Sequence, residues 1–305
     1  MIRGPSRWER DGFRGAGAFM SQVHHFSYGV LTPVAAYVMS FIGSLIGLQC
    51  TSRARAASGL SRASWLALAA VAIGGTGIWV MHFIAMLGFT VSGMEIRYDV
   101  GLTLLSAVIA IAVVGVGTFM AGFGGPKAIV VLPAGFVTGL GVAAMHYTGM
   151  AAMNLAAEVS YTPGIVLLSV LIAVVAATAA LWFTLRVRGT LATGAAAMIM
   201  GVAVSGMHYT GMAALNVRPA AGAAGPTGAG AIDLLMPLVV GVSVVAVVLL
   251  VIVTVFPGEA EMVHAADLDR RTQELARRRE PAAPSQEAPA PRPQPKKTTN
   301  QWFDA

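Results

Sequence analysis

The hexapeptide Met145-His146-Tyr147-Thr148-Gly149-Met150 recurs letter for letter as Met207-His208-Tyr209-Thr210-Gly211-Met212. A looser copy, Met81-His82-Phe83-Ile84-Ala85-Met86, lies upstream, so the three histidines stand 64 and then 62 residues apart. Such a steady spacing indicates an internal repeat rather than a chance echo. A glycine also stands seven residues before each histidine, at Gly75, Gly139 and Gly201. Most other letters nearby have diverged, so the hexapeptide is kept more strictly than its surroundings.

The composition around the hexapeptides is that of an integral membrane protein. The chain has 305 residues, of which 56% are hydrophobic and 11% charged, against roughly 25% charged in soluble domains. Each apolar run is long enough for a helix of about 20 residues to cross a bilayer, and none has an acidic or basic residue in its interior. The runs are 29–50, 65–88, 100–121, 129–153, 163–185, 191–215 and 234–256. We therefore predict an all-α polytopic membrane protein with seven transmembrane helices.

The helices between the hexapeptides repeat as well. Residues 105–110 (Leu-Ser-Ala-Val-Ile-Ala) match residues 168–173 (Leu-Ser-Val-Leu-Ile-Ala) with an offset of 63. The building block is thus a two-helix unit that occurs about three times, with the run 234–256 appended. Internal repeats in membrane proteins commonly frame a binding site at their shared interface.

Basic residues set the expected organisation across the membrane. The first, third and fifth loops and the C-terminal tail are the basic ones, which by the positive-inside rule places the C-terminus in the cytoplasm and the N-terminus outside; the four arginines before residue 15 argue the other way. We expect an extracytoplasmic segment at 1–28, a membrane domain at 29–256, and a charged, Pro-rich, largely disordered tail at 257–305. The tail carries eight of the 20 basic residues, together with eight acidic ones, and we interpret it as a membrane-facing segment rather than a nucleic-acid site.

Each hexapeptide offers an imidazole and a thioether on one helix face, because residues four apart are neighbours on a helix. All three copies end even-numbered runs, so the histidines are expected near the outer surface at a common depth. A set of imidazole and thioether ligands favours copper, with haem between facing histidines second. The single cysteine, Cys50, lies at the opposite end. The predicted metal-binding residues are His82, Met86, His146, Met150, His208 and Met212, with Met81, Met145 and Met207 pointing about 100° away.

Blander interpretations remain open. Histidine and methionine also pack in membrane interiors without any ligand. Tyr147 and Tyr209 either supply hydroxyls to the site or act as interfacial anchors, and we favour anchors. A copper carrier or transporter is a rival to a sensor. An enzyme is not expected, because the sequence offers neither a nucleophile nor a carboxylate pair.

The hexapeptides resemble the signature of the MHYT-domain family of bacterial membrane proteins, over roughly residues 25–220. The resemblance implies a six- or seven-helix sensor in the cytoplasmic membrane that binds copper through histidine and methionine and responds to oxygen, carbon monoxide or nitric oxide. The first copy departs from the signature, with Phe83 and Ile84 in place of tyrosine and threonine. Many family members also carry a cyclic-di-GMP or kinase module. None is evident in this sequence, so here the signal is expected to leave through the tail or a cytoplasmic partner.

Overall fold

The computed structural model describes residues 23–219, 225–255 and 266–275. Within these residues, seven helical spans are long and apolar enough to cross a membrane, which confirms the predicted fold class. The second span is continuous through α3 (Gly59–Ala70), η1 (Val71–Val80) and α4 (Met81–Leu87). The other spans are α2 (Leu31–Ala56), α5 (Val100–Gly124), α6 (Ala128–Ala151), α7 (Pro163–Arg186), α8 (Thr190–Ala213) and α9 (Ala231–Val255).

Local residue chemistry sets where several of these helices begin and end. The Asp99 carboxylate accepts a hydrogen bond of 2.7 Å from the Leu102 amide, which caps the start of α5. Pro163 occupies the first turn of α7, where its missing N–H costs nothing. Gly125 and Gly189 have φ angles of 81° and 82°, a backbone conformation open mainly to glycine. They make the tight connections from α5 to α6 and from α7 to α8.

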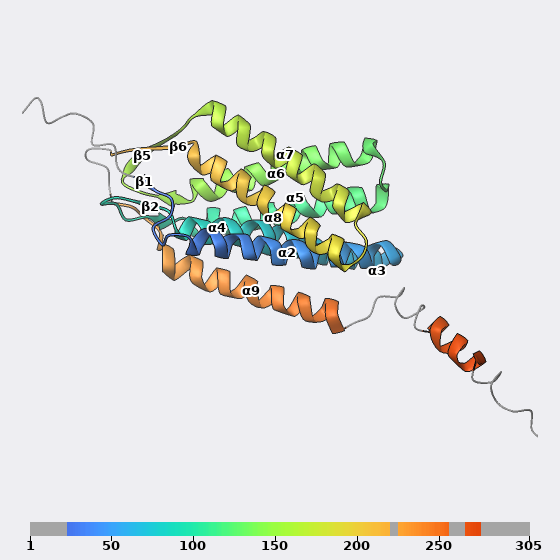
Figure 1. Cartoon of the computed structure of the whole chain (residues 1–305). Helices are drawn as coiled ribbons and strands as arrows, with labels where there is room; N and C mark the ends of the chain where they lie inside the picture. Colours follow the sequence, from blue (N-terminus) through green and yellow to red (C-terminus); the bar gives the residue numbers. More distant parts are fainter. Residues whose placement is uncertain (1–22, 220–224, 256–265, 276–305) are drawn as a thin grey trace, which may run out of the picture. The chain divides into compact units, whose positions relative to one another are not determined.

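Six of the spans form a closed ring. Going around it, α2 packs on η1, η1 on α5, α5 on α6, α6 on α7, α7 on α8, and α8 back on α2 (Figure 1). Helix α9 lies outside the ring against α2, η1 and α4. The spans that carry the hexapeptides are therefore alternate members of the ring, and each can point one side chain at its centre.

Close backbone contact holds one part of the ring together. A Cβ added to Gly43 on α2 would lie only 2.6 Å from the Cα of Gly77 on η1. Glycine is needed there because helices in a membrane associate by tight packing of small residues. The segment η1 is a π-helix of 10 residues that ends next to the first hexapeptide. Such wide turns are rare and frequently occur at functional sites.

Short strands join the loops at one end of the ring, which we call the histidine end because α4, α6 and α8 end there. The loops following these three helices pair with one another or with the segment before α2 (Figure 1). The pairs are β1 (Val23–His24) with β2 (Thr90–Val91), β3 (Arg97–Tyr98) with β4 (Met153–Asn154) and β7 (Ala229–Gly230), and β5 (Ala157–Tyr161) with β6 (Leu215–Pro219), all antiparallel.

Three arginines, two in the last turn of α2 and one in the first turn of α3, close the other end, which we call the arginine end. Arg53 donates to the Val253 carbonyl, Arg55 to those of Thr184 and Val187, and Arg62 to that of Gly122. These acceptors lie in the final residues of α9, α7 and α5 or just beyond. The guanidinium groups therefore satisfy carbonyls that have no partner within their own helix.

The flanking predictions are described only in part. Most of the segment 1–28 lies outside the described residues. Met262–Ala305 form a separate unit in which residues 266–275 are helical, with an ion pair between Asp267 and Arg271. The rest of the tail that is predicted to be largely disordered lies outside the described residues, and the orientation of the termini across the membrane stays a prediction.

Candidate metal centre

One histidine from each hexapeptide reaches a common point at the histidine end. His82 on α4, His146 on α6 and His208 on α8 each stand five residues before the last residue of their span. The Nδ1 atom of His82 lies 3.0 Å from Nδ1 of His208 and 3.2 Å from Nδ1 of His146. One nitrogen from each ring lies within 4.8 Å of the other two. We call these residues the histidine triad.

The three rings are arranged like the blades of a propeller. Their centroids are 4.9 to 5.2 Å apart, and their planes cross at 80° to 89°. No ring is more than 1% exposed. Because the rings come from equivalent positions of three repeats on alternate ring helices, the near three-fold arrangement follows from the repeat itself.

The triad cannot satisfy itself by hydrogen bonding alone. Each ring nitrogen of a neutral histidine carries either one proton or one lone pair. The Nδ1 atom of His82 faces two others at hydrogen-bond distance, so a single proton or lone pair must serve both contacts. A cation between the three nitrogens would use all three lone pairs at once. Among the described residues, this group of potential metal ligands consists of three histidines, without a cysteine or a carboxylate.

Glycine creates the space for two of the rings. A Cβ on Gly149 would lie 2.5 Å from Nε2 of His82, and a Cβ on Gly211 would collide with Nε2 of His146. Both Nε2 atoms are buried without a hydrogen-bond partner, although a metal-binding histidine usually donates its second N–H to a neighbour. The fifth letter of the hexapeptide is therefore part of the site. Sequence reasoning missed this role, and its signal was the glycine shared by the second and third copies.

The two tyrosine hydroxyls have different surroundings. The Tyr147 hydroxyl lies 2.6 Å from the Ser169 hydroxyl on α7. The Tyr209 side chain is partly buried, and its hydroxyl is buried without a hydrogen-bond partner. Anchoring of either tyrosine at the membrane surface stays a prediction. In the first copy, which has Phe83, the indole of Trp79 donates to Ser106 on α5 at 3.0 Å. Ser106 and Ser169 are equivalent positions of the repeat, so each is used by the neighbouring span.

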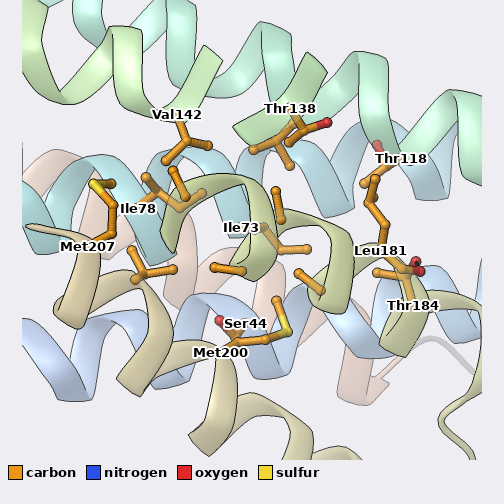
Figure 2. A pocket seen from close by; sticks show the side chains of 16 residues that line it. Ser44, Ile73, Ile78, Thr118, Thr138, Val142, Leu181, Thr184, Met200 and Met207 are labelled. Atoms are coloured by element: carbon orange, nitrogen blue, oxygen red, sulfur yellow. Dashed lines mark hydrogen bonds between the residues drawn. The ribbon is translucent and has the colours of Figure 1, made fainter. Parts of the chain in front are cut away.

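The predicted methionines are all buried but divide among different surroundings. None of Met81, Met86, Met145, Met150, Met207 and Met212 is more than 2% exposed. Met81 packs with Ala36 and Ala85, apart from the main apolar cluster that contains the other five. Met207 lines an apolar cavity in the centre of the ring (Figure 2). The structure thus brings the histidines together and leaves a ligand role for the methionines as a prediction.

The segment before α2 covers part of the histidine end. His24 lies in β1, and His25 stacks on Phe89 with a centroid distance of 5.6 Å. Partial burial lowers the pKa of His25, which favours its neutral form near neutral pH. His24 is exposed. The two histidines therefore differ in their surroundings, since His25 is partly buried and His24 is exposed.

Together these features define a class: a multi-pass membrane protein whose repeated spans each deliver one histidine to a buried cluster. Residues 75–132 and 139–197 match the MHYT family model, described as a bacterial signalling protein N-terminal repeat. The membrane domain therefore carries repeats of the MHYT family over these residues. The third hexapeptide lies beyond these two matches.

The curated relatives are bacterial signalling proteins. The chain is 36% identical over 260 residues to the bifunctional diguanylate cyclase/cyclic di-GMP phosphodiesterase MucR of Pseudomonas aeruginosa, covering 82% of this chain and 37% of that protein. It is 41% identical over 154 residues to the cyclic di-GMP phosphodiesterase NbdA of the same organism, covering 48% and 20%. The signaling protein YkoW of Bacillus subtilis is 29% identical over 201 residues, covering 62% and 24%. The chain thus spans well under half of each relative, and it matches only their sensor part. No solved structure matches it.

Proposed function

We propose that this membrane signalling domain is a sensor that binds one copper ion per chain at the histidine triad. The single observation that carries the proposal is the convergence of one ring nitrogen from each of three buried histidines within 4.8 Å of one another. Imidazole suits copper well, and the Irving–Williams order favours copper over the other divalent metals at such a site. The neighbouring methionines would add preference for Cu(I), because thioethers are soft ligands.

Haem fits these surroundings less well. The rings pack directly against one another and against Gly149 and Gly211, and a macrocycle would have to separate them. A single ion needs no such rearrangement.

Bound copper would supply a place where oxygen, carbon monoxide or nitric oxide can bind, or where a change of oxidation state can occur. The chain's own residues exclude water from that place and hold the imidazoles on three separate spans. Any change in the preferred spacing of the three imidazoles would therefore act on α4, α6 and α8 together. Helix α9 packs on α4 and η1 and is the described span that leads toward the C-terminal tail.

Two relatives are named as cyclic-di-GMP enzymes, and we propose that this sensor likewise serves cyclic-di-GMP signalling. No enzymatic activity is proposed for the chain itself. Its output would pass to a signalling partner in the cytoplasm.

The test is the copper content of purified protein after loading with Cu(I) and removal of weakly bound metal. Wild type should hold about one copper per chain, and His82→Ala, His146→Ala and His208→Ala should each hold much less. His24→Ala, an exposed histidine at the same end, is the matched control and should equal wild type. Equal copper in all five proteins would end the proposal. Binding of carbon monoxide to the loaded Cu(I) protein, followed by infrared spectroscopy, then tests the gas step.

A further inference from the structure

The ring of helices encloses an apolar cavity next to the triad. It holds about 600 Å³ of space not filled by protein atoms, a volume that includes space open to solvent. Three of its lining residues stand close to the triad along the chain: Met207 precedes His208, while Ile78 and Val142 come four residues before His82 and His146. Figure 2 shows these three toward one end of the cavity and Thr118, Leu181 and Thr184 at the other.

The cavity exists because α7 turns small side chains inward. Ala173, Ala176, Ala177 and Ala180 recur at helical spacing along its inner face and line the space. Larger residues at these positions would fill it. From Ala173 to Thr184 the lining of α7 extends over twelve residues, or about 16 Å between the first and the last at 1.5 Å per residue. The space is therefore long and apolar.

The far end of the cavity adjoins a second, smaller pocket that two arginines line. Thr118 and Thr184 line both the apolar cavity and a pocket of about 230 Å³ that includes Arg55 and Arg62. No carboxylate lines either space. Two cationic groups thus stand at the arginine end of an apolar chamber without an acidic partner in its walls.

The guanidinium groups retain unused donors. Arg55 donates to two carbonyls and Arg62 to one, while each group carries five N–H donors. The Nε atom of Arg62 is buried without a partner. Buried N–H groups are normally satisfied, and an anion placed between Arg55 and Arg62 would accept from them.

We propose that the centre of the ring binds a single-chain anionic amphiphile of the fatty-acid class. Its carboxylate would lie at Arg55 and Arg62, and its hydrocarbon chain would fill the apolar cavity toward the triad. The apolar walls select a hydrocarbon, the arginines select an anion, and the narrow length of the chamber selects one chain rather than two. This site does not depend on copper at the triad.

The probe is radiolabelled dodecanoate, whose extended chain is comparable in length to the cavity. Binding is measured to the full chain in phosphatidylcholine nanodiscs with a metal chelator present, and binding to empty nanodiscs is subtracted. The expected result is saturable binding of about one dodecanoate per chain, in keeping with one cavity. Dodecanol, which lacks the charge, should bind at least about tenfold more weakly, since charge-assisted hydrogen bonds are the strong ones.

Variants separate the two ends of the site. Ala177→Phe fills the cavity and should abolish dodecanoate binding. Val175 lies on the outer face of the same helix and is 60% exposed, so Val175→Phe should leave the binding unchanged. Arg55→Gln combined with Arg62→Gln should weaken dodecanoate by about tenfold and leave dodecanol unaffected. Circular dichroism and size-exclusion chromatography check that each variant folds.

A chain-length series on the wild type needs no variant. Affinity should rise from hexanoate to dodecanoate and then fall for octadecanoate, because the cavity is finite. A steady rise through octadecanoate would mean simple partition into lipid and would overturn the proposal. Equal binding of dodecanol, or of Ala177→Phe, would do the same. If dodecanoate binds in phosphatidylcholine nanodiscs but not in phosphatidylglycerol nanodiscs, the occupant is a membrane lipid, and the fatty-acid assignment is overturned.

Discussion

The imidazole of His82 on α4 lies against Gly149 on α6, so closely that a Cβ at position 149 would stand 2.5 Å from its Nε2 atom. His146 repeats the relationship with Gly211 on α8. The glycine of one hexapeptide therefore positions the histidine of the preceding one. This contact explains physically why the second and third copies have glycine as their fifth residue, since each glycine leaves room for the histidine of the preceding copy.

A methyl group at this contact should disturb copper binding without removing a ligand. We expect Gly149→Ala and Gly211→Ala to lower copper affinity by about 10- to 100-fold, the usual effect of disturbing the support of a metal ligand. Affinity is measured by competition with a Cu(I) chelator of known strength.

Gly206→Ala on α8 is the control, because a Cβ there meets nothing within 4 Å. It should bind copper like wild type and, if anything, gain up to about 1 kcal/mol of helix stability. A wild-type copper affinity in Gly149→Ala would show that the position of the His82 imidazole does not depend on this contact.

Removing one hydroxyl from each of two equivalent tyrosines should have different effects. Tyr147→Phe loses the 2.6 Å hydrogen bond to Ser169 and should cost about 0.6 kcal/mol, a typical value for side-chain hydrogen bonds within membranes. Tyr209→Phe removes a buried hydroxyl that has no partner and should be neutral or stabilising.

The measurement is the midpoint of unfolding in SDS titrations of both variants. The first copy already carries Phe83 at this position, so the change is one that the repeat tolerates. A larger loss in Tyr209→Phe than in Tyr147→Phe would contradict the hydrogen bonding seen here.

Much of the fold could be predicted because lipid leaves few options. The run predicted at 163–185 is the helix Pro163–Arg186, and the run at 100–121 lies within Val100–Gly124. Unbroken apolar sequence is enough to locate a membrane helix, since its backbone must bond within itself. The meeting of the three histidines followed from their equal position in each repeat.

Other features depend on packing that periodicity does not reveal. The seating of His82 on Gly149 requires knowing which helices are neighbours. The π-helical segment η1 carries the same glycine-to-histidine spacing as its regular counterparts, so the spacing could not distinguish it. The central cavity arises because the alanines of α7 face inward, and the hydrogen bond between Tyr147 and Ser169 depends on which helix lies beside α6.

Copper should stabilise the folded protein through the triad. A ligand that binds only the folded state adds about 2.7 kcal/mol at a concentration 100 times its Kd. We therefore expect Cu(I) to raise the unfolding temperature of wild type and a strong chelator to reverse the rise. His146→Ala should show neither effect. A copper-induced rise that persists in His146→Ala would locate the stabilising ion elsewhere.

The crossing of α2 and η1 should be among the least tolerant positions of the membrane domain. Gly43 faces the backbone of Gly77, and a backbone cannot rotate away as a side chain can. Gly43→Ala must push the two helices apart, and overpacking of this kind costs about 1–3 kcal/mol. The measurement is again SDS unfolding. Gly241→Ala on α9, where a Cβ meets nothing within 4 Å, is the control and should be neutral or slightly stabilising.

Because η1 leads directly into the first hexapeptide, Gly43→Ala should also weaken copper binding, whereas Gly241→Ala should not. If Gly43→Ala proves as stable as wild type, the close approach of α2 to η1 is wrong.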